Sequence, residues 1–389
     1  MRITIKQFDA IRNEIILYRS SSNHKNIFAI KPPPPIKNLL SNGLLLFLFF
    51  VCLSFYSLEA QNTESESGDA YRVMFYNVEN LFDPYDDSLK RDEEFTPDGE
   101  RHWTNYKFYD KLNKIYKVIM AVGEWQPPAI VGLSELENRF VLEKLIWETP
   151  LKNFDYRIIH HESPDRRGID VGLIYRASMF EPFHDEAIPV VFADDTSYKT
   201  RDILYVKGLV GGKQMVHIFV NHWPSRYGGY MATVIRRNEA AAILKQKTDS
   251  LLAVNPRSAI IIMGDFNDGP HDESFAKVLK AIMPESEIIP QNYYNLSLLK
   301  QDDWNFGTLK YRESWDIFDQ VVVSGNLLME NADLMIKDKK ACIFHADFLL
   351  EKDNTYLGFK PFRTFTGFKY NGGYSDHLPV YLDLIIKNK

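Results

Sequence analysis

The chain has 389 residues, of which 45% are hydrophobic, 25% charged and 14% aromatic. These proportions are typical of a globular protein with a sizeable core, and they exclude a disordered, collagen-like or polytopic membrane protein. Two cysteines exclude a disulfide scaffold and a cysteine-based zinc module, and a formal net charge of −6 is not the basic composition of a protein that holds nucleic acid by charge alone.

Residues 1–60 have the features of an export leader. Two lysines flank a run of four prolines, every residue from Leu44 to Leu53 is apolar, and the segment ends at the small residue Ala60. A basic flank, an apolar stretch and a small-residue exit are typical of a cleaved secretory signal. An uncleaved membrane anchor over residues 39–58 is the alternative, because that stretch is just long enough to span a bilayer.

The rest of the chain reads as a short linker and one large domain. Losing the leader's seven Lys/Arg and three Asp/Glu would change the formal net charge from −6 to −10. A polar linker is predicted over residues 61–70, and no break in composition follows it. We therefore expect a single catalytic domain over residues 71–389.

Strand-like apolar runs alternate with helical patterns through this domain. Apolar residues recur at helical spacing from Phe108 to Val122, and Gly123 stands where that helix would stop. Two further helices are predicted over residues 233–252 and 274–283. Eight strands are predicted, over residues 72–76, 129–133, 171–175, 203–206, 216–220, 259–263, 319–323 and 380–385. The alternation predicts an α/β (α+β) fold.

Polar side chains gather at the ends of the predicted strands, where a loop can present them while the strand holds them still. Five clusters stand at such ends: Asn77, Glu135, His222, the pair Asp265 and Asn267, and the pair Asp376 and His377.

This set of residues favours one kind of chemistry. It contains carboxylates, amides and two histidines, without a cysteine or a serine in a nucleophile motif. Hard oxygen ligands select Mg²⁺, Mn²⁺ or Ca²⁺ over zinc. Asparagine and histidine can then donate hydrogen bonds to phosphoryl oxygens as charge develops. The set predicts metal-assisted attack of water on a phosphate ester.

Each cluster alone also has a structural explanation. A glutamate after a strand is usually a solvated loop residue, Gly-Asp-Phe-Asn can simply form a turn, and Ser-Asp-His can cap a helix. The occurrence of all five clusters at strand ends, in this order, favours a functional site.

Three longer motifs accompany these residues: Asn-Val-Glu-Asn-Leu-Phe-Asp at 77–83, Arg-Gly-Ile-Asp-Val at 167–171 and Asn-His-Trp-Pro-Ser at 221–225. With them, the sequence from about residue 71 to residue 386 resembles the endonuclease/exonuclease/phosphatase superfamily, which includes deoxyribonuclease I, exonuclease III, inositol-polyphosphate 5-phosphatases and neutral sphingomyelinases. It is most similar to secreted bacterial members. The resemblance implies a four-layer sandwich of two packed mixed β-sheets flanked by helices, with a site at one edge.

The resemblance also implies a metal site. Glu135 would be the principal ligand, supported by Asn77 and Asp376, and the cofactor would be Mg²⁺, with Mn²⁺ able to replace it. Ser134 stands where the family often has glutamine. Glu137 lies two residues beyond Glu135, so on a continuing strand both would face the same way, and Glu137 could compete for the metal.

Catalytic roles follow from the same resemblance. Asp265 would orient or deprotonate the attacking water, with Asn267 holding it and the phosphate. His377 would contact the scissile phosphate, and Asp319 would fix its tautomer and raise its pKa. His222 matches the second histidine of the deoxyribonuclease I branch, and would protonate the leaving oxygen or stabilise charge on it. Asp265 and His377 both stay open as the general base.

Three arginines are candidate phosphate contacts, because guanidinium binds phosphate in a bidentate manner: Arg167, Arg201 and Arg236. A salt bridge or a solvated surface charge explains each of them equally well.

The expected function is that of a secreted Mg²⁺-dependent endonuclease that cleaves DNA or RNA phosphodiesters. The alternative is a phosphatase or phosphodiesterase on inositol phosphates, sphingomyelin or other small or lipid phosphate esters. A sphingomyelinase should expose an apolar hairpin, and the nearest candidate, residues 341–344, reads as core. A non-catalytic binding module is disfavoured because no expected ligand or histidine is missing. No protein partner is evident, and a monomer is expected.

Overall fold

The computed structural model describes residues 70–124, 126–284, 287–300 and 307–387. The predicted leader, residues 1–60, lies outside them, so the expected signal or anchor stays a prediction. Among the helices that the structure describes, none is both long and apolar enough to cross a membrane.

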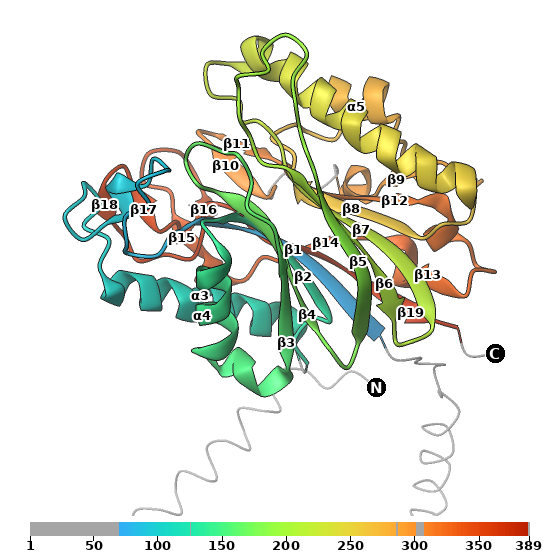
Figure 1. Ribbon diagram of the computed structural model, residues 1–389, viewed down its shortest axis with the longest axis horizontal. Helices are drawn as coiled ribbons and strands as arrows, with labels where there is room; N and C mark the ends of the chain where they lie inside the picture. Colours follow the sequence, from blue (N-terminus) through green and yellow to red (C-terminus); the bar gives the residue numbers. More distant parts are fainter. Residues whose placement is uncertain (1–69, 125, 285–286, 301–306, 388–389) are drawn as a thin grey trace, which may run out of the picture. The chain divides into compact units, whose positions relative to one another are not determined.

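Two mixed β-sheets lie at the centre of the fold (Figure 1). In the first sheet the long strand β1 lies between the parallel strand β2 and the antiparallel strand β19. The described strands of this sheet are β13 (Leu334–Ile336), β19 (Val380–Ile386), β1 (Ala70–Leu81), β2 (Ile130–Leu136), β4 (Asp170–Arg176) and β3 (Tyr156–His160) in that order, with β14 (Cys342–Ile343) also paired to β19.

The second sheet has a similar centre, in which β7 and β8 run parallel. Its other pairings are antiparallel. The described strands are, in order, β5 (Phe180–Ile188), β6 (Ile203–Val210), β7 (Gln214–His222), β8 (Ile260–Asp265), β12 (Asp319–Ser324) and β9 (Tyr293–Asn295).

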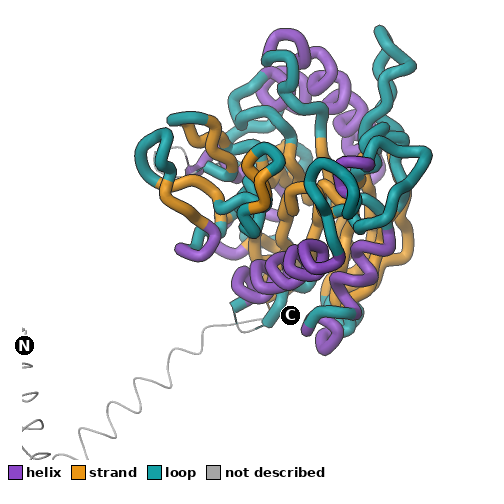
Figure 2. Tube along the Cα trace, turned by 90° about the vertical axis from the view of Figure 1, so that its left-hand side faces the viewer, coloured by secondary structure: helices purple, strands orange, loops and turns teal. Residues whose placement is uncertain are grey.

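Helices cover the outer face of each sheet and complete the four layers (Figures 1 and 2). The outer face of the first sheet packs on α3 (Asn105–Gly123) and α4 (Arg139–Trp147). That of the second sheet packs on α5 (Tyr230–Val254) and the short π-helical turn η4 (Ser274–Leu279). The expected sandwich is therefore confirmed.

Strands that are apolar throughout lie between two covered faces. In β8, Ile261 and Met263 pack between the sheets, whereas Ile260 and Ile262 pack under α5. Because successive side chains of a strand alternate between faces, a strand covered on both sides needs apolar residues at every position.

Smaller elements connect these layers. Three hairpins lie on the side of the sandwich where β1 ends (Figure 1). They are β10 (Leu309–Tyr311) with β11 (Ser314–Asp316), β15 (Leu350–Lys352) with β16 (Phe359–Pro361), and β17 (Phe365–Thr366) with β18 (Lys369–Tyr370). The 3-10 turns are Glu93–Phe95, Pro150–Phe154, Leu296–Lys300, Gly325–Leu328, Lys337–Lys339 and Asp347–Leu349.

All eight predicted strands correspond to observed strands, with residues 129 and 259 lying one residue before β2 and β8. The helix predicted from Phe108 ends at Gly123 as expected. The helix predicted over residues 274–283 was wrong beyond Leu279. Lys280 adopts a left-handed conformation with φ 58°, and the N–H of Ala281 turns back to the carbonyl of Phe275. The predictions did not include α4, β3, β5 or the short strands β9, β10, β11, β13, β14, β15, β16, β17 and β18.

Candidate active site

The sheet topology brings the predicted site residues to one edge of the sandwich. Asn77 and Glu135 stand near the ends of the parallel strands β1 and β2, and His222 and Asp265 end the parallel strands β7 and β8. Antiparallel strands begin where their neighbours end, so β12 and the loop before β19 start at the same edge. In the second sheet His222 and Asp319 are the two register partners of Asp265.

Asp265 is the point at which these side chains meet. Its Oδ2 lies 3.6 Å from Nε2 of His222 and 3.8 Å from Nε2 of His377. The amide Nδ2 of Asn77 donates to the same oxygen at 3.0 Å and thereby joins the two sheets. Burial raises the pKa of Asp265 to about 6, opposed by His377 and reinforced by the Asp319 and Glu135 carboxylates. A carboxylate of that pKa can exchange a proton near neutral pH.

The Gly-Asp-Phe-Asn motif has a local structural reason. A Cβ on Gly264 would lie 2.3 Å from the carbonyl oxygen of Asn221, so only glycine lets β8 approach β7 this closely. Oδ1 of Asp265 accepts the backbone N–H of Asn267 at 3.0 Å. Asn267 is left-handed with φ 51°, and its Nδ2 donates to the carbonyl of Trp223 at 3.1 Å. The motif therefore fixes the direction of the Asp265 carboxylate.

His377 and Asp319 form a buried pair, with Nδ1 2.7 Å from Oδ2. Burial alone would lower the pKa of His377, but Asp319 and Asp265 outweigh it and raise that pKa well above its usual range. Ser375 holds the backbone here, since its hydroxyl donates to the carbonyl of Asn77 and accepts the N–H of His377. His377 is placed to act as a charged hydrogen-bond donor.

His222 is also buried, but the charges that act on it are positive, whereas those that act on His377 are negative. Burial, together with the charges of Arg201, Arg167 and His377, lowers its pKa well below the usual range. Within the described part of the chain its buried Nδ1 has no hydrogen-bond partner. A neutral imidazole donates one hydrogen bond and accepts one, but it does not carry the second proton that the expected protonation of a leaving oxygen requires. His222 is therefore suited to the other expected role, contact with the charge that develops there.

Two carboxylates fit a hard divalent cation. Oε1 of Glu135 accepts from Asn77 at 3.2 Å, and Oε2 accepts the N–H of Asn80 at 2.8 Å. Oδ2 of Asp376 accepts from Arg363 at 2.7 Å, while Oδ1 lies 4.0 Å from Nε2 of His377. Oxygen pairs of this kind match the ligand preference of Mg²⁺, which leaves further positions to water and substrate.

Asn77 is placed to orient those carboxylates. Its Oδ1 accepts the backbone N–H of Glu79 at 2.9 Å, which turns Nδ2 toward Glu135 and Asp265. An amide NH₂ has no lone pair available for a cation. A ligand role for Asn77 would fall to the second lone pair of its Oδ1, and that role stays a prediction.

Glu137 does not share a direction with Glu135. Glu135 has φ 62° and the register of β2 shifts between Ser134 and Leu136, so the strand does not continue regularly. Oε2 of Glu137 instead accepts the backbone N–H of Asp83 at 2.6 Å. Burial raises the pKa of Glu137 to about 9. The expected competition for the metal is therefore not supported.

The three predicted arginines have different surroundings. Arg201 is 4% exposed and donates to Asp165 and to the carbonyls of His222 and Trp223, so it holds the end of β7 and is not a substrate contact. Arg236 lies on α5 with its guanidinium 3.8 Å from the ring centroid of Tyr198. Arg167 has a half-exposed side chain and lies near enough to His222 to depress its pKa.

Sequence reasoning missed four charged residues around the site. Glu79 and Lys111 are buried, and each interacts with Asp376. Arg363 pairs with Asp376, and Nε of Arg226 donates to the carbonyl of Asn267 at 2.7 Å. Glu79 and Arg226 stand in or beside recognised motifs, which is a usable signal. Nothing local marks Lys111 on its helix, or Arg363, as a site residue.

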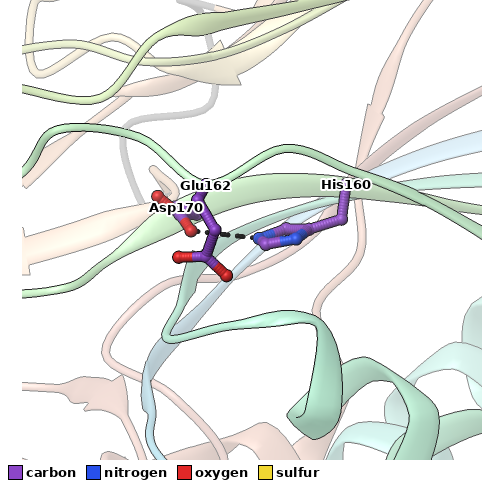
Figure 3. A group of neighbouring side chains, drawn as sticks. All are labelled: His160, Glu162 and Asp170. Atoms are coloured by element: carbon purple, nitrogen blue, oxygen red, sulfur yellow. Dashed lines mark hydrogen bonds and ion pairs between the residues drawn. The ribbon is translucent and has the colours of Figure 1, made fainter. Parts of the chain in front are cut away.

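A separate group of side chains could also hold a cation: His160, Glu162 and Asp170 (Figure 3). Their potential ligand atoms all lie within 4.8 Å of one another. Asp170 already binds Nε2 of His160 at 3.0 Å and accepts the N–H of Ser163 at 2.9 Å. These bonds anchor the loop that carries Arg167.

The sequence profile of the Endonuclease/Exonuclease/phosphatase family matches residues 72–386. The chain belongs to this family. Members of the Endonuclease/Exonuclease/phosphatase family hydrolyse phosphate esters and use divalent metal ions. A search of curated protein sequences found no match.

Several solved structures resemble this one. Humanized TDP2 of D. rerio has a TM-score of 0.49 and 15% identity, with 81% of this chain and 98% of that chain covered. The human Nocturnin catalytic domain has a TM-score of 0.49 and 17% identity, with 82% and 95% covered. A family protein from Bacteroides thetaiotaomicron has a TM-score of 0.49 and 15% identity, with 83% and 100% covered. Likenesses at this level bear on neither substrate nor mechanism.

Proposed function

We propose that this phosphoester hydrolase is a secreted, Mg²⁺-dependent endonuclease that cleaves DNA or RNA phosphodiesters by attack of an activated water. The observation that supports it most directly is the placement of two histidines, His222 and His377, within 3.8 Å of Asp265 Oδ2. A general base flanked by two imidazoles is suited to a phosphate whose attacking and leaving oxygens lie on opposite sides.

In this proposal the residues divide the work by their surroundings. Glu135 and Asp376 would hold the cation, which when bound would neutralise charge on the phosphoryl group. Asp265 takes the proton of the attacking water. His377, kept charged by Asp319, donates a hydrogen bond to a non-bridging oxygen as negative charge develops there. His222 contacts the oxygen on the other side.

Nucleic acid is the favoured substrate because His222 corresponds to the second histidine of the deoxyribonuclease I branch, and because Arg167 lies beside it with a half-exposed side chain. The net charge of −10 expected after loss of the leader predicts weak affinity for a polyanion and a strong dependence on divalent cation.

Plasmid nicking by the purified chain tests this proposal. The reaction is run with Mg²⁺, with Mn²⁺ and with a chelator, alongside the Glu135→Gln variant. Nicking that requires both the cation and Glu135 supports a metal-dependent nuclease. A folded protein that binds Mg²⁺, hydrolyses small phosphate esters and leaves plasmid and RNA intact would contradict the nuclease assignment.

One observation favours the alternative, a phosphodiesterase or phosphatase on lipid or small phosphate esters. The hairpins beside His377 expose large apolar side chains: Tyr311 is 63% exposed, Leu357 95% and Phe359 56%. Leu309 of β10 forms a bridge with His377, and Lys310 ties that strand to the carbonyl of Leu357 at 2.8 Å.

Residues 341–344 do not form this surface, because Ala341 is buried and β14 pairs with β19. Release of phosphocholine from sphingomyelin vesicles, or of phosphate from inositol phosphates, at rates above those on plasmid would favour the alternative function.

We also propose that residues 1–60 form a cleaved export signal and that the mature protein is a monomer. Sequencing the N-terminus of protein recovered outside the cytoplasm tests the first point. Retention of the apolar stretch in a membrane fraction would instead favour an anchor. Light scattering of the purified protein tests the second point.

A further inference from the structure

Arg363, which follows β16, lies against the proposed metal site. Its Nη2 donates to Oδ2 of Asp376 at 2.7 Å, and its Nε lies 3.4 Å from Oε1 of Glu79. Both contacts use one edge of the guanidinium group. The side chain is 42% exposed, and within the described residues Nη1 has no hydrogen-bond partner. One donor of Arg363 is therefore open to a ligand beside Asp376.

Two buried charged residues, Glu79 and Lys111, hold the segment that carries Arg363. Oε2 of Glu79 accepts the backbone N–H of Thr364 at 2.6 Å. Nζ of Lys111 donates to Oγ1 of Thr364 at 2.5 Å and to the carbonyl of Tyr374 at 2.7 Å. Glu79 is 4% exposed and Lys111 is 1% exposed. Buried charges are costly unless they are paired and hydrogen-bonded, so these contacts fix the backbone beneath the guanidinium firmly.

Two other arginines near the site, Arg201 and Arg226, are already occupied by the protein. Arg201 uses Nε, Nη1 and Nη2 on internal acceptors. Arg226 donates to the carbonyl of Asn267 and to the carboxylates of Asp268 and Asp272. Arg363 thus differs from both in combining a fixed position with an open donor.

The carboxyl groups around Asp265 would repel an anionic phosphate, and a positive charge beside them would offset that repulsion. Glu135, Asp265 and Asp376 place three carboxyl groups where an anionic phosphate must approach, and Arg363 interacts with both Glu135 and Asp376. We propose that Arg363 is a substrate-binding residue that donates from its free edge to a non-bridging oxygen of the phosphate. This inference rests on the proposed hydrolysis of phosphate esters and specifies which arginine receives the anion.

Three variants of the full chain test the inference: Arg363→Ala, Arg363→Lys and the matched control Arg257→Ala. Arg257 is exposed and precedes β8, at the opposite end of that strand from Asp265. Circular dichroism and thermal unfolding establish that each variant is folded. The lysine variant keeps the charge and loses the planar fork, so it separates phosphate geometry from charge alone.

The first readout is hydrolysis of bis(p-nitrophenyl) phosphate, resolved into kcat and KM. Losing an arginine–phosphate contact should raise KM about 10- to 100-fold in Arg363→Ala, with a smaller rise in Arg363→Lys. The second readout is the affinity for inorganic phosphate measured by calorimetry, which should fall in parallel. The third is Mn²⁺ affinity measured by electron paramagnetic resonance, which should be unchanged or tighter because a neighbouring cation has been removed. Arg257→Ala should match the wild type in all three.

The outcomes separate the claims. Weaker Mn²⁺ binding in Arg363→Ala, with KM and phosphate affinity unchanged, would mean that Arg363 only orients Asp376, and would overturn the inference alone. If the wild type hydrolyses the ester and Arg363→Ala behaves like Arg257→Ala, the inference would also be overturned. A wild type that hydrolyses no phosphate ester would overturn the proposed function together with this inference.

Discussion

Nδ1 of His377 lies 2.7 Å from Oδ2 of Asp319, although the two residues are 58 positions apart in the chain. Asp319 begins β12 of the second sheet, and His377 stands in the loop that leads into β19 of the first. The pair therefore connects the two sheets at the edge where Asp265 lies. A carboxylate on Nδ1 leaves Nε2 directed toward Asp265 and keeps the imidazole charged.

Replacing Asp319 by asparagine should keep the shape of this pair and remove its charge. We expect kcat to fall by roughly 10²- to 10⁴-fold, as for other histidines that lose an orienting carboxylate. Because Asp319 raises the pKa of His377, the variant's histidine should lose its proton at a lower pH. The alkaline limb of the pH–rate profile should shift to lower pH. Asp338→Asn on an exposed turn is the control, and an unchanged limb in Asp319→Asn would contradict the role given to the pair.

Glu135 and Glu137 offer a matched comparison for metal binding. Glu135→Gln removes one of two proposed carboxylate ligands and should weaken Mn²⁺ binding by at least about tenfold. Glu137→Gln should leave it nearly unchanged, because burial raises the pKa of Glu137 to about 9 and its neutral form resembles glutamine. Calorimetric titration of both variants with Mn²⁺ checks this. Equal losses in the two would mean that Glu137 also contacts the metal.

Arg201 should matter for folding rather than for substrate. Arg201→Met would remove the 3.1 Å ion-pair partner of the buried Asp165 carboxylate and the arginine donors to the carbonyls of His222 and Trp223. Asn267 would still donate to the carbonyl of Trp223. Breaking a buried pair in this way costs about 3–5 kcal/mol. Urea unfolding should therefore show a large loss in the free energy of unfolding. Arg236→Ala should change it by less than about 1 kcal/mol, as expected for an arginine away from the core. A higher KM in folded Arg236→Ala would show that the sequence-based assignment of Arg236 was right after all.

His217 predicts a pH dependence of stability that is separate from the site. Its Nδ1 lies 2.7 Å from the hydroxyl of Tyr205, and burial, with Lys207 and Lys247, lowers the pKa of His217 to about 4. The unfolded chain, with a pKa of about 6.5, then binds more protons than the folded chain between these values. Stability should fall as pH drops from about 6.5 to about 4. Thermal unfolding of His217→Gln should show a smaller fall over this range, and an equal fall would refute the assignment.

Local patterns in the sequence were enough to predict the central strands and most of the site. Continuous apolar runs such as that of β8 identify strands covered on both faces, because few other structures bury every successive side chain. Asp265 stands at the end of such a run, and because a strand ends at the edge of its sheet, polar residues at these positions are predicted to lie there. The shorter α4 and the turn after Leu279 were not predicted correctly, since packing and one left-handed residue decide them.

Only the tertiary structure decided what each charged side chain contacts. The local sequence does not show what Arg201 or Arg363 contacts. Arg201 is enclosed by Asp165 and the carbonyls of His222 and Trp223, whereas Arg363 contacts Asp376 and keeps one edge of its guanidinium group free. These partners come from segments far apart in the chain. Long-range packing sets burial and the distances between charges, and these determine whether an arginine supports the fold or faces a substrate.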